Sequence, residues 1–305
     1  TTDISSTGSA FAAIREDGSV VTWGNATDGG DSSSVASLID GDTPSEDVVQ
    51  VYATTSAFAA IRKNGSVITW GDTDNGGNTT DVASSVNGTI DVVQIFSTNN
   101  AFAALRSDGS VVTWGDKDKG GDSSAVASDL NGTVDVSKIA STPNAFAALK
   151  TDGSVVAWGS PGTGGDTSGL IDEDLDGSVS AVREVFSNNN SFAALRADGS
   201  VITWGISAFG GNSSSVENKI KTTTHADFQQ VTSIVATGSA YAAIRADGSV
   251  VTWGNSLEGG DSSSVASEID GDTDVHDVVQ VYATTSAFAA LRKDGSVITW
   301  GDANN

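Results

Sequence analysis

Short apolar runs alternate with glycine-containing turns along this chain, in a pattern that occurs seven times. In the second copy, VVQVYA (48–53), AFAAIR (57–62) and SVITW (66–70) are strand-like runs, with Asn64-Gly65 between the last two. An Asn-Gly or Asp-Gly pair between apolar runs is the strongest short hairpin signal, because glycine takes positive φ at little steric cost. Each copy therefore predicts a hairpin plus one further strand.

The strand-like runs are apolar on both faces. In the second copy, Phe58 and Ala60 point to one face and Ile61 points to the other. A strand with two apolar faces needs a sheet packed above it and another below it. Alanines allow neighbouring sheets to approach closely, while one large aromatic side chain and one Trp per copy fill the remaining space.

The period of the pattern selects among folds made of stacked sheets. One tryptophan falls in each copy, 44 to 49 residues from the next: Trp23, Trp70, Trp114, Trp158, Trp204, Trp253 and Trp300. A unit of about 40 to 50 residues is typical of a propeller blade, whereas β-helix coils are much shorter. We therefore predict an all-β, seven-bladed β-propeller.

No linker or shift of composition interrupts the repeat, so residues 1–305 are interpreted as a single domain, expected to belong to a longer secreted protein. An open array of such blades would leave two end sheets exposed, because no repeat has a polar outer face. We therefore expect the ring to close. After each Trp-Gly comes a variable tetrapeptide and then, in six copies, a Gly-Gly pair that predicts a backbone bend.

The repeat resembles a known family. An apolar strand, Asp-Gly, Val-hydrophobic-x-Trp-Gly and a glycine pair, with DGSVxTWG or a close variant seven times, resemble the regulator of chromosome condensation repeat. The resemblance covers the whole chain and implies a seven-bladed propeller, here in a divergent bacterial member. The family's histidine before the second strand is Ala57 or its equivalent in this chain, and the Gln-Leu-Gly continuation is absent. The resemblance is therefore used for the fold and not for nucleotide exchange.

Composition excludes several functions. The net charge of −24 repels the phosphates of nucleic acid and the headgroups of anionic membranes. Without cysteine the chain has no disulfide and no thiolate chemistry, and no run of 18 apolar residues predicts a membrane span. The lack of Cys and Met together with high acidity is typical of bacterial secreted proteins. We expect an extracellular or cell-surface location.

Catalytic residues are not evident in the sequence. The two histidines, His225 and His276, stand in spacers between repeats and have no equivalent in other copies, and no nucleophile, phosphate-binding or zinc motif accompanies them. We predict that the protein is not an enzyme. A cation precedes each hairpin turn and is expected to be part of the scaffold, although a ring of cations could also bind an anion: Arg15, Arg62, Arg106, Lys150, Arg196, Arg245 and Arg292.

Calcium is the candidate cofactor. In IDEDLDGSV, the residues Asp172, Asp174 and Asp176 alternate before Gly177 and match the opening of an EF-hand loop. The twelfth position is Arg183, where that loop requires a bidentate Glu, so only half of the motif is present. The alternative interpretation is an ordinary acidic turn in an acidic chain.

The tetrapeptides after Trp-Gly are where the copies differ most, at 25–28, 72–75, 116–119, 160–163, 206–209 and 255–258. Identical positions in a repeat array build the scaffold, and differing loops can build a surface for a partner. The candidate binding residues are Asp74, Asn75, Asp118, Ile206, Phe209 and Leu257. In the apolar tetrapeptide 206–209, the side chains form either an inward-folded cap or a contact site.

The favoured function is a non-enzymatic, extracellular recognition or adhesion module that binds a protein or a glycan through these loops. The alternative is a structural subunit that assembles with copies of itself into a fibre or a surface layer. Neither hypothesis involves nucleic acid or insertion into a membrane.

Overall fold

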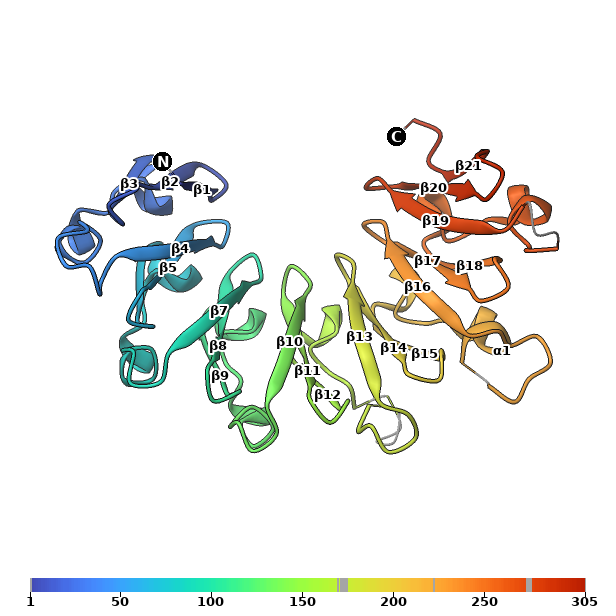
Figure 1. Ribbon diagram of the computed structural model, residues 1–305, viewed down its shortest axis with the longest axis horizontal. Helices are drawn as coiled ribbons and strands as arrows, with labels where there is room; N and C mark the ends of the chain where they lie inside the picture. Colours follow the sequence, from blue (N-terminus) through green and yellow to red (C-terminus); the bar gives the residue numbers. More distant parts are fainter. Residues whose placement is uncertain (1, 169, 171–174, 222, 273–275, 305) are drawn as a thin grey trace. The chain divides into compact units, whose positions relative to one another are not determined.

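Strands dominate the part of the chain that the computed structural model describes, which is residues 2–168, 170, 175–221, 223–272 and 276–304. They form seven three-stranded antiparallel sheets, one for each repeat (Figure 1). We call these sheets blades 1 to 7 in chain order. The fold class is the predicted one, all-β with seven blades of the β-propeller type.

Each blade is built from three consecutive strands. Blades 1 to 4 contain β1 (Asp3–Ser6), β2 (Ala10–Ile14), β3 (Val20–Gly24); β4 (Val48–Ala53), β5 (Ala57–Arg62), β6 (Val67–Gly71); β7 (Val92–Ser97), β8 (Ala101–Arg106), β9 (Val111–Gly115); β10 (Val136–Ser141), β11 (Ala145–Lys150) and β12 (Val155–Gly159). Blades 5 to 7 contain β13 (Val182–Ser187), β14 (Ser191–Arg196), β15 (Val201–Gly205); β16 (Val231–Ala236), β17 (Ala240–Arg245), β18 (Val250–Gly254); β19 (Val278–Ala283), β20 (Ala287–Arg292) and β21 (Val297–Gly301).

Short helical turns occupy the connections. Those that follow Trp-Gly are η1 (Ala26–Gly30), η3 (Thr73–Gly77), η5 (Lys117–Lys119), η7 (Pro161–Thr163), η9 (Ser207–Phe209) and η11 (Ser256–Glu258). Those in the spacers are η2 (Ser33–Leu38), η4 (Thr80–Ser85), η6 (Ser124–Val126), η10 (Ser214–Val216), α1 (Glu217–Ile220) and η12 (Ser263–Glu268). Among the described residues, no helix has the length and apolarity that crossing a bilayer requires.

The chain divides into two compact units. Unit 1 comprises Thr1–Thr151 and Ala157–Ser160, and unit 2 comprises Asp152–Val156 and Pro161–Asn305. Unit 1 thus holds blades 1 to 3 and most of blade 4, and unit 2 holds blades 5 to 7. In the colours of Figure 1, unit 1 runs from blue to green and unit 2 from yellow-green to red.

The hairpin of each blade sets a pair of aromatic rings side by side. In blade 2, Phe58 pairs with Trp70 across the strands, and Gly65 in the turn has φ of 75°. The two rings stack with their centroids 5.3 Å apart. Cross-strand aromatic pairs of this kind stabilise a hairpin beyond the area they bury. The predicted hairpin is confirmed, together with its turn.

Neighbouring blades bury these rings against alanines. Ala57 and Ala59 of blade 2 pack in one cluster with Phe102 and Trp114 of blade 3. Phe58 of blade 2 packs on the other side against blade 1. The central strand of blade 2, β5, is therefore buried on both faces, as the alternation predicted.

The glycine pair is more than a bend. Gly76 has φ of 105°, and a Cβ atom there would lie 2.6 Å from a ring carbon of Phe102 in the next blade. Its carbonyl accepts the indole N–H of Trp114 at 3.0 Å. Equivalent indole bonds are made by Trp70, Trp158, Trp204, Trp253 and Trp300, each to the glycine of the preceding blade. A missing side chain thus makes room for the next Phe–Trp pair.

The prediction that all seven tryptophans are buried is wrong for Trp23. The other six tryptophans are between 2% and 6% exposed, but Trp23 is 44% exposed and so is Phe11, with which it stacks. The rings of blade 2 pack against residues of blade 1, and no described blade packs in that way against Phe11 and Trp23. Burial depends on the neighbouring blade and not on the repeat itself.

Several of the periodic cations are held within the scaffold. Arg106 and Arg245 lie 3.8 and 3.7 Å from the aspartate of their own hairpin turn. Arg62 and Lys150 reach instead to spacer carboxylates, at 3.4 Å in both cases. These ion pairs and the hydrogen bonds beside them engage the cations with the chain itself.

Candidate functional site

The tetrapeptides form turns whose backbone is fixed by the first residue. In blade 2, the Asp72 carboxylate accepts the Asp74 N–H at 2.9 Å, and in blade 3 Asp116 accepts the Asp118 N–H at 3.0 Å. The Asp72 carbonyl also accepts the Gly77 N–H at 2.7 Å. A short polar side chain that satisfies a backbone N–H two residues on is a stable local turn.

A second anchor holds the other end of each turn. Thr54, in the loop between the first two strands of blade 2, donates its hydroxyl to the Asn75 carbonyl at 3.0 Å. Thr98 does the same to the Lys119 carbonyl at 3.1 Å in blade 3. In unit 2, the Asn188 side chain takes the place of threonine and donates to the Phe209 carbonyl at 2.7 Å. The backbone of the turns is thus alike while their side chains differ.

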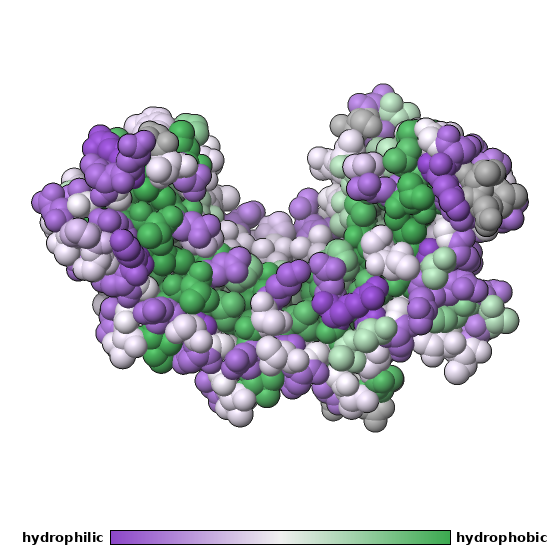
Figure 2. Space-filling model, viewed as in Figure 1, coloured by the Kyte–Doolittle hydropathy of each residue, from purple (hydrophilic) through white to green (hydrophobic). Residues whose placement is uncertain are grey.

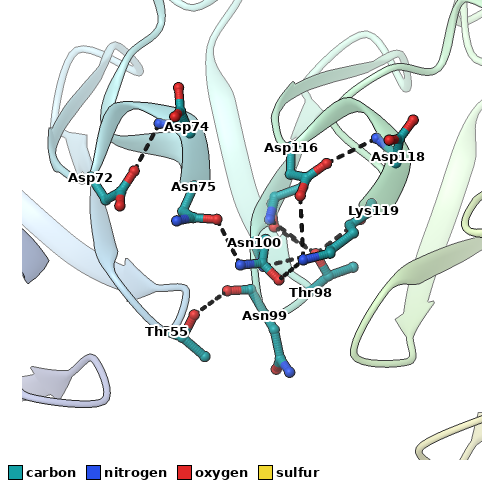
Figure 3. A network of polar contacts seen from close by, with 11 residues as sticks. Thr55, Asp72, Asp74, Asn75, Thr98, Asn99, Asn100, Asp116, Asp118 and Lys119 are labelled. Carbon is teal, nitrogen blue, oxygen red and sulfur yellow. Dashed lines mark hydrogen bonds and ion pairs between the residues drawn. The ribbon is translucent and has the colours of Figure 1, made fainter.

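Side chains from blades 2 and 3 meet in a polar network (Figure 3). The Asn100 side-chain amide donates to the Asn75 side-chain oxygen at 2.6 Å. The Lys119 ammonium donates to the Asn100 oxygen at 3.2 Å and lies 3.3 Å from the Asp116 carboxylate. We call residues 72–75, 98–100 and 116–119 the unit 1 face. Its side chains are tied to each other across two blades.

Backbone hydrogen bonds run beneath this face from blade to blade. Gly8 donates its N–H to the Thr55 carbonyl, Thr55 donates to Asn99, and Asn99 donates to Pro143, each at 2.9 Å. The Thr55 hydroxyl also donates to the Asn99 carbonyl, at 2.6 Å (Figure 3). Because proline has no N–H, Pro143 can accept in this ladder but cannot donate.

Unit 2 has the same kind of ladder. Asn189 donates its N–H to the Gly238 carbonyl at 3.2 Å, and Gly238 donates to Thr285 at 2.7 Å. In both units the donor of each of these bonds lies in one blade and the acceptor in the blade that follows it along the chain. The loops that carry the candidate residues therefore rest on a rigid base.

The three predicted residues of unit 1 fall on one face. Asp74 and Asp118 are exposed, and Asn75 is half-buried in the network (Figure 3). Sequence reasoning missed Asn100 and Lys119, which join the two turns. The Asn-Asn pair at 99–100 was the available signal, because these residues replace the Thr-Ser of the second copy directly before a strand.

The three predicted residues of unit 2 are apolar and differently exposed. Ile206 and Phe209 are half-buried, and Leu257 is 77% exposed. Ile206 cannot cap its turn with a side-chain hydrogen bond, unlike Asn255, which accepts the Leu257 N–H at 3.0 Å. Because Ile206 and Phe209 are half-buried, these two side chains form neither a fully buried cap nor a freely exposed patch.

Most of the residues in the calcium prediction lie outside the part of the chain that the structure describes. Asp172 and Asp174 lie outside the described residues. Asp176 is exposed, and hydrogen bonds from the Ser178 hydroxyl and N–H hold the pKa of its carboxyl below the usual range. Among the residues described, no three His, Asp or Glu side chains gather as a metal site would require. Calcium binding stays a prediction.

Comparison with known proteins concerns the fold. No family model matches the sequence, and no curated protein matches it. The chain is similar to Prp20p from Saccharomyces cerevisiae, the yeast RCC1 protein, at 18% identity over 98% of this chain and 82% of that one, with a TM-score of 0.44. It is also similar to human WBSCR16 at 14% identity over 99% and 87%, with a TM-score of 0.48.

A plant receptor is also similar. The CRINKLY WD40 ectodomain of the Arabidopsis thaliana receptor kinase ACR4 is 15% identical over 98% of this chain and 96% of its own, with a TM-score of 0.43. Likeness at this level describes fold alone. The seven three-stranded sheets agree with the RCC1-like, seven-bladed class that the repeat resembles. The binding partners of these similar proteins are not assigned to this chain.

Proposed function

We propose that the unit 1 face binds a partner protein, and that the chain is a non-enzymatic recognition module of an extracellular or cell-surface protein. The observation that carries this proposal is the similar backbone of the turns in blades 2 and 3. Thr54 and Thr98 anchor them in the same way, while the side chains they display change from blade to blade. A fixed frame with variable side chains is what a repeat protein needs for specific binding.

The charges of the face favour a cationic partner. The face holds four aspartates and two lysines: Asp74 and Asp118 present exposed carboxylates, the Lys119 ammonium is engaged by Asp116 and Asn100, and Lys117 is exposed. The net charge of −24 attracts positive partners over a distance and raises their rate of association. A basic segment of a protein therefore fits better than an acidic one.

The unit 1 face has the groups that binding requires and no catalytic arrangement among its described residues. Its polar groups are amides, hydroxyls and an ion pair, none arranged as a nucleophile with its base. His225 lies apart in a spacer, 3.7 Å from Asp227. The extracellular location is supported by composition alone, since the chain has no Cys and no Met.

A binding screen with a matched charge variant tests the proposal. The wild type is screened against basic peptides, surface proteins and glycans. Asp74→Lys with Asp118→Lys should reduce binding of a basic peptide at least tenfold, because both carboxylates become repulsive. Glu16→Lys with Asp135→Lys makes the same change of charge at exposed positions near the hairpin turns and should reduce it little. Equal losses of peptide binding in the two double variants would mean that only net charge matters. Binding of glycans alone would mean that the partner is a carbohydrate and not a protein.

Calcium is proposed as a stabilising ion and not as a requirement for folding. The support is the alternation of Asp172, Asp174 and Asp176 in a chain strained by its own negative charge. Calcium at its dissociation constant would add about 0.4 kcal/mol by mass action. Thermal unfolding in millimolar calcium, compared with sodium chloride of matched ionic strength, should show a gain that Asp174→Asn with Asp176→Asn removes. Equal gains from both salts would indicate screening alone.

A further inference from the structure

The outermost strand of blade 3, β9, has one edge without a partner strand. A propeller blade commonly has four strands, whereas each blade of this chain has three. Hydrogen-bonded pairs alternate along an antiparallel ladder, and the Arg106 N–H and the Ser110 carbonyl make one such bond between β8 and β9. Val111, Thr113 and Gly115 therefore direct their backbone groups away from β8, towards the position of a fourth strand.

The spacer after blade 3 runs beside this edge and pairs with its backbone at one end. There the Val111 N–H donates to the Leu130 carbonyl at 2.9 Å. Further along the strand the contact is made by a side chain: the Thr113 hydroxyl donates to the Gly121 carbonyl at 3.2 Å and lies 2.9 Å from the Ser123 hydroxyl. The spacer is thus held beside β9 without taking the place of a paired strand.

Several backbone groups of this edge have no partner within the part of the chain that the structure describes. The N–H groups of Thr113 and Gly115 donate to no residue there, and the carbonyls of Val111 and Thr113 accept from none. Thr113 is only 7% exposed, and unpaired backbone groups in a buried strand cost free energy. Donors and acceptors in a row along an edge are a template for pairing with another chain.

A groove of about 460 Å³ gives access to these groups, because residues 111–115 line it. Both adjoining spacers contribute to its lining, with residues 78–82 and 121–124. Val82 and Val112 in it are half-buried, beside exposed hydrophilic residues. On the face of unit 1 shown in Figure 2, hydrophobic residues likewise lie between hydrophilic ones. A mixed lining of this kind suits an extended peptide, which has a polar backbone and side chains that alternate in direction.

The charged and aromatic groups of the groove favour a basic peptide over a sugar. Trp114 is 4% exposed, so its ring offers no platform on which a sugar could stack. Two exposed carboxylates, those of Asp81 and Asp122, stand against the single ammonium of Lys117 in the lining. Hydrogen bonds from the N–H and the hydroxyl of Ser124 hold the pKa of the Asp122 carboxyl below its usual range, so this group stays charged at neutral pH.

The groove is continuous with the unit 1 face, because Thr73 and Lys117 belong to both. We propose that an extended basic segment of the partner protein enters this groove and pairs with the edge of β9 as a fourth strand. Addition of a strand supplies affinity through main-chain hydrogen bonds and specificity through alternate side chains. The proposal rests on the function proposed for the unit 1 face, since one partner would occupy both surfaces.

Blade 6 has a groove in the matching position with a different balance of charge. This groove, of about 600 Å³, is lined by Thr252 of β18, the equivalent of Thr113. Lys219 and Arg245 in its lining balance the carboxylates of Asp261 and Asp270. A basic segment should therefore prefer the groove of blade 3, and blade 6 supplies a control within the same chain.

Backbone methylation of a peptide tests the pairing without changing the protein. The probe is a capped peptide in which lysine alternates with valine, titrated against the wild type by calorimetry. Two further forms carry methyl groups on the backbone nitrogens of all lysines or of all valines. The two forms should differ at least tenfold in affinity, because only alternate residues of a strand bond to one edge. Equal affinities of the two forms, or no binding of the parent peptide, would overturn the proposal.

Proline variants locate the edge that the peptide uses. Thr113→Pro removes an N–H that points away from β8 and should weaken binding of the parent peptide at least tenfold. Thr113→Ala removes the hydroxyl alone, as blade 4 does naturally with Ala157, and should retain most of the binding. Thr252→Pro makes the same change in blade 6 and should alter binding little. Equal losses from the two proline variants would point to a general effect on the fold and would overturn the proposal.

Charge variants distinguish the groove from the unit 1 face. If Thr113→Pro does not fold, Asp81→Lys with Asp122→Lys replaces it, since both side chains are exposed, and should also weaken binding at least tenfold. Asp74→Lys with Asp118→Lys changes the face alone. Peptide binding that depends on these two residues but not on the groove variants would overturn the fourth strand and leave the proposed function. Binding that depends only on the groove would support the fourth strand and contradict recognition by the face.

Discussion

Blades 1 and 3 carry the same aromatic pair in opposite surroundings. The ring centroids lie 5.4 Å apart in the Phe11–Trp23 pair and 5.3 Å apart in the Phe102–Trp114 pair, so the hairpin alone sets the distance between the rings. Yet Phe11 is 44% exposed and Phe102 is 0% exposed. The comparison teaches that ring pairing is a property of one repeat, whereas burial is a property of two.

The largest difference should appear when the tryptophans are removed. Trp114→Ala deletes a buried ring and leaves an indole partner unsatisfied, so it should lower the free energy of unfolding by about 3 to 5 kcal/mol. Trp23→Ala should cost about 1 kcal/mol, because the ring is already half in water. Chemical denaturation of dilute protein measures both. Equal costs would show that the first blade is covered in solution.

The second largest loss of stability should follow from replacing the glycine against which the Phe–Trp pair of the next blade packs. Gly76→Ala places a Cβ atom against Phe102 at a residue with φ of 105°, and we expect a loss of about 2 kcal/mol or more. Gly162→Ala is the control, because its added Cβ would meet nothing within 4 Å. Differential scanning calorimetry should show a lower melting temperature for the first variant alone. A harmless Gly76→Ala would mean that blade 3 does not pack as closely as described.

The loop threonines allow a smaller test of covered against uncovered blades. Thr98 is buried and holds both its own loop and the Lys119 carbonyl, so Thr98→Val should cost about 1 to 2 kcal/mol. Thr284, its exposed equivalent in blade 7, bonds within its own loop, and Thr284→Val should cost about half as much or less. Unfolding in urea resolves the difference. The reverse order would contradict the anchoring role of Thr98.

Acid stability should show no difference between the two blades. Bonds from Ser19 hold the pKa of Asp17 below its usual range, and in blade 3 burial raises the pKa of Asp108 but bonds from Ser110 outweigh it. Both carboxylates thus stabilise the fold above the unfolded pKa of about 3.9, and this contribution is lost as pH falls through their lower folded values. Asp17→Asn and Asp108→Asn should each make the loss of stability between about pH 4 and pH 2 less steep. A steeper loss in either variant would reverse the sign of the assigned shift.

Much of the single blade could be predicted from the sequence. Alternating apolar residues and Asn64-Gly65 gave the hairpin and its strands, since both signals act between residues close in the chain. The variable tetrapeptides were also found, because differences among copies stand out against a repeated background. Local rules were sufficient wherever the partners belonged to one repeat.

Contacts between repeats could not be predicted in the same way. Trp23 and Trp114 stand in the same motif, so no local pattern separates the exposed ring from the buried one. The bond from Trp114 to the Gly76 carbonyl and the link between Asn75 and Asn100 join residues of different copies. Such pairs depend on how one blade is rotated on the next, which periodicity does not encode.

The indole bonds also bear on how such a chain can evolve. Each joins residues 38 to 43 positions apart, always from one copy to the copy before it. An array in which every unit recognises only its immediate neighbour can gain or lose whole units by recombination without redesign of the others. The near identity of residues 29–43 and 259–273 fits such an event. The number of blades can then differ between related chains, and selection can act on that number as it acts on chain length.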